Sequence, residues 1–305
     1  MGSKDRGSII LGSVAAICVV FFWSGWMVIS RLGVTGHLTV FDLTGLRHGI
    51  GAVVILPYII WSRAWRGLTP WRTFILALTA GAPYALLSYS GFIYAPAAHG
   101  GVFLNGCLPI FTTLFAWIWL GQRSRFSQMV GLVIILAGVT LVGYEGFLSS
   151  DGSMTWVGDS LFLAAIALFA LFMVANQVWS VVPRQVIFSV TIVPAVVYTP
   201  IWLLWLDSNL TSAPFSEVIL QGAYQGLVPS ILGISCLNIA VRNIGPRATS
   251  VFFVSVPVMA ALAAIPVLNE LPGLPAWIGM ITVTFGILLA LGIIRFHQKI
   301  AAAGE

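Results

Sequence analysis

Charged residues are scarce in this sequence. Only 8% of its 305 residues are Asp, Glu, Lys or Arg, and 59% are hydrophobic, whereas about a quarter of a soluble domain is charged. The composition therefore excludes an ordinary soluble domain and indicates a chain that lies mostly in lipid. The three cysteines, Cys18, Cys107 and Cys236, lie in apolar runs without a CxxC pair, which argues against a disulfide framework or a metal centre. We expect no metal and no cofactor.

Asp and Glu are also missing from the middle of the apolar runs. A proton-coupled exporter of lipophilic cations needs a carboxylate in the membrane, so the sequence argues against that class. Lys and Arg are missing at the same depth, which argues against transport of phosphates or sugar nucleotides. A zwitterionic or neutral organic solute remains as the expected substrate of a transporter.

Apolar stretches of the length that crosses a bilayer, roughly 20 residues, recur along the whole chain. They predict an all-α integral membrane protein with ten transmembrane helices, because the strands of a membrane barrel would alternate apolar and polar residues instead. The least secure break is the short link 94–96. The predicted spans are 8–29, 43–62, 73–93, 97–119, 127–147, 157–178, 187–205, 217–239, 248–267 and 274–294.

The charges orient these spans. With a cytoplasmic N-terminus, 12 of the 14 Lys and Arg residues fall on the cytoplasmic side, as the positive-inside rule requires. Seven acidic residues, from Asp42 to Glu270, fall on the other side. We therefore predict a multi-pass protein of a bacterial inner membrane with both termini in the cytoplasm. The net charge of +5 then reflects topology, and no nucleic-acid partner is expected.

The chain also matches itself at a fixed offset. At a shift of 148 residues Pro109 meets Pro257, Gly131 meets Gly279 and Gly138 meets Gly286, and Gln122 meets Glu270; at a shift of 146, Pro83 meets Pro229. These matches predict two five-helix repeats, 1–150 and 151–305. Because five is odd, the repeats have opposite orientations in the membrane. Inverted repeats are typical of transporters, whose substrate lies near the midplane between the halves.

Two segments carry a family resemblance. "APAAHGGVFLNGCLPIFTTLFAWIWLGQR" (95–123) and "GPRATSVFFVSVPVMAALAAIPVLNE" (245–270) each join a small-residue link to a proline-centred span. In this the chain resembles the EamA-type drug/metabolite transporter superfamily over both halves, and most of all the bacterial YddG-type exporters of aromatic amino acids. The first half departs from the LGE pattern of that superfamily, with Gln122 at the position of the acid.

The segment "GAPYALLSYSG" (81–91) interrupts an apolar run with a proline and several hydroxyl groups. On a helix, Gly81, Tyr84, Ser88 and Gly91 share one face. This face either lines a wet central cavity or packs closely against another helix. Our candidates for substrate binding are Trp23, Tyr84, Ser88, Tyr89, Asn105, Tyr224, Gln225 and Ser230. The alternative is a place in the interfacial aromatic belt for Trp23 and hydrogen bonding between helices for the polar side chains. Pro83, Pro109, Pro229 and Pro257 are candidate helix breaks and hinges.

Three further polar residues are candidates for gating or for contact with a substrate carboxylate. Arg47 and His48 lie in the outer part of the second span, where Arg47 either extends outward, with Asp42 as a partner, or holds the carboxylate. His99 opens the fourth span, as a neutral hydrogen-bonded side chain or as a proton relay.

Together these features predict an exporter of small organic metabolites, most of all aromatic or neutral amino acids, working by alternating access at a central cavity between the repeats. The alternatives are transport of another metabolite or drug, a membrane-embedded enzyme, and a receptor or scaffold. The sequence has no HExxH, and "GISC" around Ser235 is not GxSxG, so we expect no enzyme. The expected partners are a small-molecule substrate and the lipid bilayer. A monomer is compatible with the sequence, which leaves the oligomeric state open.

Overall fold

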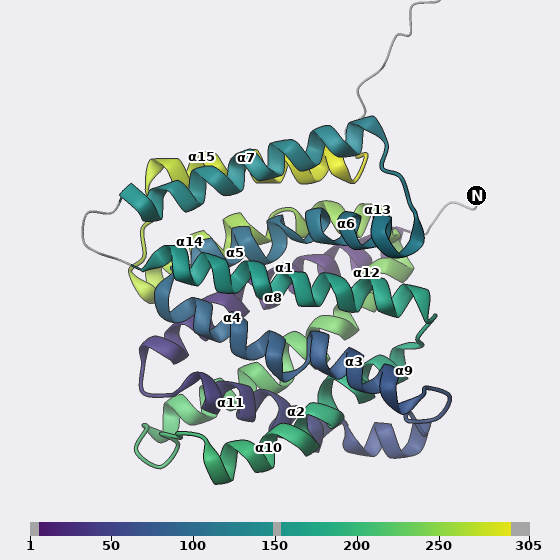
Figure 1. Ribbon diagram of the computed structural model, residues 1–305, viewed down its shortest axis with the longest axis vertical. Coiled ribbons are helices and arrows are strands. Elements are labelled where there is room, and N and C mark those ends of the chain that lie inside the picture. Colours follow the sequence, from purple (N-terminus) through teal and green to yellow (C-terminus); the bar gives the residue numbers. More distant parts are fainter. Residues whose placement is uncertain (1–5, 149–153, 294–305) are drawn as a thin grey trace, which may run out of the picture.

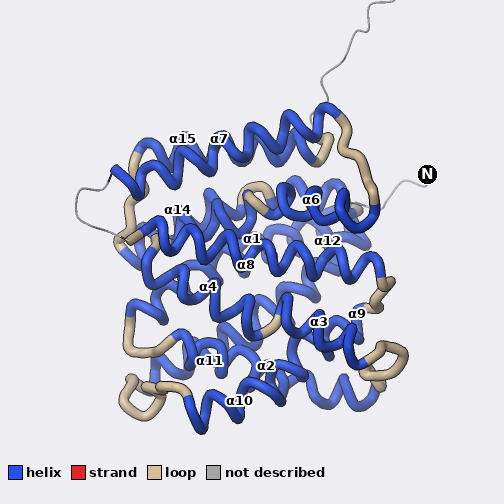
Figure 2. The backbone as a smooth tube through the Cα atoms, viewed as in Figure 1, coloured by secondary structure: helices blue, strands red, loops and turns tan. Residues whose placement is uncertain are grey.

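The computed structural model describes residues 6–148 and 154–293, which form helices and loops without a strand among them (Figure 2). The helices lie roughly parallel to one another across the view of Figure 1. Those of the first half are α1 (Arg6–Thr35), α2 (Val40–Ser62), α3 (Pro70–Ala80), α4 (Ala82–Tyr94), α5 (Ala97–Gly101), the π-helical turn η1 (Val102–Gly106), α6 (Leu108–Leu120) and α7 (Phe126–Leu148). Those of the second half are α8 (Thr155–Val178), α9 (Pro183–Ile187), η2 (Phe188–Ile192), α10 (Val193–Trp205), α11 (Phe215–Leu227), η3 (Val228–Leu232), α12 (Gly233–Ile244), α13 (Pro246–Phe253), α14 (Val256–Leu268) and α15 (Leu274–Ala290).

Eight helical segments of the described chain are long and apolar enough to cross a membrane. The segments Pro70–Tyr94, Ala97–Leu120 and Pro183–Trp205 each count as one span, although each contains a break in its regular helix. The shorter apolar helix α15 and the continuous series α11–η3–α12 lie at the two remaining predicted spans. The predicted boundaries agree with the structure to within six residues, and the uncertain break at 94–96 is present at Ala95 and Pro96.

Local chemistry explains several of these boundaries. Thr39 caps α2 through its hydroxyl, which accepts from the backbone N–H of Asp42, and the Asp42 carboxylate accepts from the N–H of Thr39 in return. Helix α6 ends at Gly121 with a φ of 64°, and α14 ends at Asn269 with a φ of 54°. Glycine and asparagine are the residues that adopt this left-handed conformation most readily. The two ends lie 148 residues apart, at the offset of the sequence repeat.

The packing of α7 against α15 shows the symmetry of the two halves. These helices run side by side at the top of Figure 1. A Cβ on Gly138 would lie 2.7 Å from the carbonyl oxygen of Gly279, and one on Gly131 would lie 2.7 Å from that of Gly286. The earlier glycine of one helix therefore faces the later glycine of the other, so the two helices are antiparallel. Because Gly131 corresponds to Gly279 and Gly138 to Gly286, the repeats are related by a pseudo-two-fold axis that passes between these helices.

The other contacts between the halves follow the same symmetry. Helix α1 packs against α12 and α14 of the second half, and the corresponding helix α8 packs against α4 and α6 of the first. The largest cluster of buried side chains draws on both repeats, and it includes Trp26, Tyr89 and Phe92 of the first and Phe162 of the second. This arrangement puts the centre of the molecule between the repeats.

Candidate substrate site and outer closure

All four candidate prolines stand at the second residue of a helical segment. Pro83 follows the break at Gly81, Pro109 follows η1, Pro229 lies within η3, and Pro257 follows the break between α13 and α14. A proline is tolerated in the first turn of a helix, where its missing N–H leaves no bond unmade. Pro83, Pro109 and Pro257 therefore follow interruptions of the regular helix, whereas Pro229 lies in a π-helical turn of the continuous series α11–η3–α12. That the four prolines act as helix breaks or hinges stays a prediction.

An aromatic cluster lies beside the first of these breaks, with Trp26 of α1 at its centre. Its ring is stacked on Tyr84 at 6.5 Å between centroids and contacts Tyr89 and Phe92 at 6.1 Å each. Tyr84 also contacts Phe169 of α8 at 5.3 Å. Trp26 is almost completely buried, whereas Tyr84 is only partly buried. The cluster therefore joins both repeats, and Tyr84 is one of its partly exposed members.

A chain of hydrogen bonds leads away from this cluster through four helices. Arg47 of α2 lies with its guanidinium carbon 5.5 Å from the centre of the Trp26 ring, and Nη1 donates to the Tyr89 hydroxyl over 3.5 Å. That hydroxyl donates in turn to Gln225 Oε1 of α11 over 2.9 Å. The Gln225 amide donates to Ser30 Oγ and Gln221 Oε1. Tyr89 and Gln225 are completely buried, so their hydrogen bonds fix the position of α4 relative to α11 next to Arg47.

The pairing of Arg47 with Asp42, one of the two sequence interpretations, is wrong. The Asp42 carboxylate is buried and already accepts hydrogen bonds from Trp202 Nε1, Ser208 Oγ and the backbone of Thr39 and Asn209. Because these four donors satisfy the carboxylate, it has no need of a cation. Arg47 instead lies over Trp26, toward the interior of the bundle.

The remaining candidates contact their own or neighbouring helices. Ser88 donates to the carbonyl of Tyr84, and Asn105 to that of Gly101. Tyr224 donates to the carbonyl of Phe22 on α1, and the Trp23 ring packs 5.0 Å from Phe253. The side chain of Ser230 lies outside the described residues. For each of these residues, contact with a substrate stays a prediction.

Gly81 and Gly91 lie where their segment packs closely against the second half. A Cβ on Gly91 would meet the Phe162 ring at 2.5 Å, and one on Gly81 would meet Pro194 at the same distance. Both positions therefore fit the close-packing interpretation of this face, in which small residues let helices approach.

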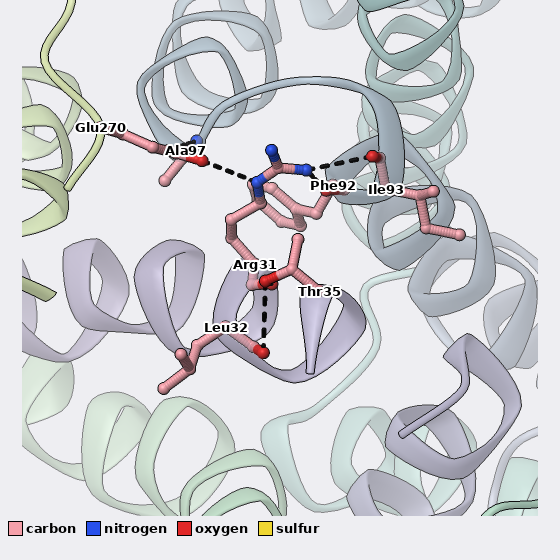
Figure 3. Close-up of polar contacts among 7 residues, drawn as sticks. All are labelled: Arg31, Leu32, Thr35, Phe92, Ile93, Ala97 and Glu270. Atoms are coloured by element: carbon pink, nitrogen blue, oxygen red, sulfur yellow. Dashed lines mark hydrogen bonds and ion pairs between the residues drawn. The ribbon is translucent and has the colours of Figure 1, made fainter. Parts of the chain in front are cut away.

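Ionic and polar contacts gather at one end of the bundle, formed by the loops 36–39, 95–96, 206–214 and 269–273, which the charge pattern predicts to face outward. We call this the outer end. Here Arg31 Nε of α1 lies 2.7 Å from Glu270 Oε1, and Glu270 Oε2 accepts from the N–H of Ala97 over 2.8 Å. The Arg31 guanidinium also donates to the carbonyls of Phe92 and Ile93 at the end of α4 (Figure 3). These contacts join α1, α4, α5 and the loop after α14.

A second buried pair lies near the outer end. His99 Nδ1 of α5 is 2.9 Å from Asp159 Oδ1 of α8, and both side chains are less than a tenth exposed. His99 is thus hydrogen-bonded in the structure, and its part in gating, in carboxylate contact or as a proton relay stays a prediction. A small cavity of about 230 Å³ lies beside His99 and is lined by His99, Glu270 and the apolar residues Pro96, Ala98, Leu271, Pro272 and Ala276.

His48 of α2 is also buried, and its Nε2 has no hydrogen-bond partner among the described residues.

Sequence reasoning missed three features of this region. Trp26 is one of 12 tryptophans, and its spacing does not distinguish it from the others. Arg31 and Glu270 are 239 residues apart, as the contact between them shows, and the sequence places both only at the outer end. The pairing of His99 with Asp159 crosses the two repeats. The alignment of the two repeats offers one signal for Arg31. Its counterpart at an offset of 146 is the neutral Gln177, so Arg31 is a charge that the second repeat lacks.

A bundle of apolar helices built from two inverted halves, with helix breaks around a central cluster, defines a multi-pass membrane transporter. The model of the EamA-like transporter family matches residues 10–144 and again residues 156–292. These two matches cover most of the chain, and the chain therefore belongs to the EamA-like transporter family.

Individual relatives are more distant. The chain is 24% identical over 279 residues to an uncharacterized transporter, YyaM, of Bacillus subtilis, covering 86% of this chain and 88% of that one. It is 22% identical over 226 residues to a probable terminal-alkyne amino-acid exporter of Streptantibioticus cattleyicolor, covering 69% of each. A solved crystal structure superposes with a TM-score of 0.64 at 20% identity, covering 95% of this chain and 99% of the other, which shows a shared fold.

Proposed function

We propose that this transporter exports small organic metabolites, most of all aromatic or neutral amino acids, across a bacterial inner membrane. The observation that carries the proposal is the cluster of Trp26, Tyr84 and Arg47 in the first repeat, whose Tyr84 ring contacts Phe169 of the second. Aromatic rings stack on an aromatic side chain, and a guanidinium binds a carboxylate in a fixed geometry. The exporter from Streptantibioticus cattleyicolor, whose name specifies an amino acid, supports the same class of substrate.

In this proposal the chain crosses the membrane ten times as two repeats, 1–150 and 151–305, with both termini in the cytoplasm, and works by alternating access. The outer end is closed in the described state by the contacts of Arg31 with Glu270, and the substrate reaches the central cluster from the cytoplasm. The proline-marked breaks allow one half to move against the other. Membership of a transporter family supports transport over the alternative of a membrane-embedded enzyme.

The test is a flux assay with the purified protein in liposomes. We expect saturable uptake of radiolabelled L-phenylalanine, with competition by other aromatic amino acids in a screen of the standard twenty. Trp26→Ala should lower the uptake at least tenfold. The matched control is Trp61→Ala, because the Trp61 side chain is 81% exposed on the surface of α2. Absence of saturable flux for every amino acid, or equal flux in the two variants, would sink the proposal.

A further inference from the structure

Arg47 is a cation without an anionic partner. Among the described residues the ion pairs are Arg31 with Glu270, His37 with Glu217 and His99 with Asp159, and none of them includes Arg47. Its contacts are the long hydrogen bond to Tyr89 and the Trp26 ring. A charged side chain inside a transmembrane segment normally pairs with another charge or marks a substrate pathway. The guanidinium is only partly buried, so most of its donors are free for a ligand.

The described residues offer no comparable partner for a substrate ammonium group. Of the carboxylates that the structure describes, Asp42, Asp159, Glu217 and Glu270 each bond other residues. Asp207 is exposed in the loop between α10 and α11. The hydroxyl that Arg47 contacts, on Tyr89, is bonded to Gln225 Oε1, and both residues are completely buried. An ammonium group at this site would meet only neutral acceptors.

The balance of charge therefore distinguishes two kinds of substrate. A monocarboxylate without an amino group neutralises Arg47 and leaves a net charge of zero in the site. A zwitterion neutralises Arg47 with one end and brings a second, unpaired cation with the other. An uncompensated charge away from water costs about several kcal/mol. The monocarboxylate avoids this cost, so it should bind more tightly than the zwitterion.

We propose that Arg47 makes the carboxylate of the substrate obligatory and that the amino group is dispensable, so that the site takes aromatic monocarboxylates as a class. Trp26 and the partly accessible Tyr84 receive the aromatic ring. Aromatic amino acids are then one member of the class, and the amino-group-free acids bind at least as well. This inference rests on the proposed function for the place of the site, but it makes a separate statement about what the site recognises.

Three probes that share one phenyl ring test it. L-phenylalanine carries both charged groups, 3-phenylpropanoate lacks the amino group, and 2-phenylethylamine lacks the carboxylate. Against uptake of radiolabelled L-phenylalanine we expect 3-phenylpropanoate to compete at an equal or lower concentration than unlabelled L-phenylalanine. We expect 2-phenylethylamine to have no effect at a tenfold higher concentration. Binding of each probe is also measured without transport, by the shift in thermal unfolding of the detergent-solubilised protein.

Variants connect the result to the residue. Arg47→Gln should weaken 3-phenylpropanoate at least tenfold in both measurements, and Arg47→Lys, which keeps the charge but loses the planar fork, should give an intermediate value. The matched control is Arg72→Gln. Arg72 also lies over tryptophan rings, at 5.5 Å from Trp71 and 5.6 Å from Trp179, which are not part of this cluster, and its variant should bind all three probes as the wild type does.

The outcomes separate the two proposals. If L-phenylalanine is transported and 3-phenylpropanoate does not compete, the inference fails and amino-acid export stands. If 3-phenylpropanoate stabilises the protein through Arg47 while no amino acid is transported, the inference stands and the proposed substrates are wrong. Competition by 2-phenylethylamine as strong as that by the acid, or unchanged binding in Arg47→Gln, overturns the role of the arginine.

Discussion

Arg31 and Glu270 form an ion pair between the two halves of the molecule, with Nε and Oε1 2.7 Å apart. Arg31 also caps the carbonyl end of α4, and Glu270 caps the amino end of α5, so each charge complements a helix end as well as its partner. Both side chains are about a fifth exposed, which reduces the effect of solvent screening. A pair that joins four segments in this way is suited to hold the outer end closed.

Loss of the charge on Glu270 should open the outer end. Glu270→Gln keeps an oxygen for the Ala97 N–H but removes the attraction for Arg31, and we expect the balance to move toward the outward-open state by about 1–3 kcal/mol, or roughly 5–150-fold. The measurement is labelling of Cys107, which is buried in the described state, by a membrane-impermeant thiol reagent added outside. Cys18 and Cys236 are first replaced by alanine.

The control for this variant is Glu217→Gln. Glu217 also pairs across the outer end, with His37, but that histidine is 64% exposed, and exposed pairs contribute about 0–1 kcal/mol. Labelling of Cys107 should therefore stay near the wild-type rate in Glu217→Gln. Equal acceleration in both variants, or none in Glu270→Gln, would contradict a specific role for the Arg31–Glu270 pair.

The corresponding positions at the other end of the bundle are neutral. Gln177 corresponds to Arg31 at an offset of 146, and Gln122 corresponds to Glu270 at an offset of 148. Both glutamine side chains are exposed, and no hydrogen bond between them is present in the described part of the chain. Two inverted repeats of equal chemistry would close both ends alike. The difference between an ion pair at the outer end and two amides at the opposite end therefore favours the state in which the outer end is closed.

Installing the ion pair at the inner end should reverse this preference. In Gln122→Glu with Gln177→Arg, closure of the inner end gains an attraction of the kind that Arg31 and Glu270 provide, and we expect faster labelling of Cys107 from outside, within the same 5–150-fold range. Gln122→Glu alone lacks the partner and should not have this effect. Labelling that is no faster in the double variant than in the single one would argue against the correspondence of the two ends.

Features that depend on residues close together in the chain can be predicted from this sequence, and features that depend on contacts between distant residues cannot. The spans and the breaks at Pro83 and Pro257 follow from composition and from the missing N–H of proline, which act within one helix. The sequence predicts the repeat because Gly131 and Gly138 have the same spacing as Gly279 and Gly286. The sequence does not predict the partner of Arg31, because a single arginine carries no pattern that selects one of several acids at the same end of the bundle.

The central site shows the same limit. The sequence directed attention to Tyr84 and Tyr89, and the structure brings both against Trp26. It could not tell a partly exposed tyrosine from a buried, hydrogen-bonded one, because both lie on the same apolar helix. Tyr84 is partly accessible, whereas the hydroxyl of Tyr89 is bonded to Gln225. That distinction arises from packing against α11, more than a hundred residues away.

The glycine contacts between α7 and α15 should tolerate no side chain. In Gly138→Ala the new Cβ would lie 2.7 Å from the Gly279 carbonyl oxygen, so the helices must separate, at an expected cost of about 1–3 kcal/mol. Thermal unfolding of the variant in detergent measures this loss of stability.

The matched control is Gly49→Ala in α2, where a Cβ would meet nothing within 4 Å. There the gain in helix propensity should stabilise the protein by about 0.5–1 kcal/mol. Equal melting temperatures for the two variants would contradict this account.

Removal of His99 should be more damaging than neutralisation of Asp159. The only hydrogen bond that Asp159 receives from the described residues comes from His99, and its second oxygen has none. His99→Ala would leave a buried carboxylate without a partner, at an expected cost of about 3–5 kcal/mol. In Asp159→Asn the amide oxygen still accepts from the imidazole, and we expect a loss of about 1 kcal/mol. His37→Ala, at the exposed pair, should change stability by no more than about 0.5 kcal/mol. Unfolding curves for the three variants give the order directly, and a smaller loss for His99→Ala than for Asp159→Asn would show that the carboxylate does not depend on the histidine.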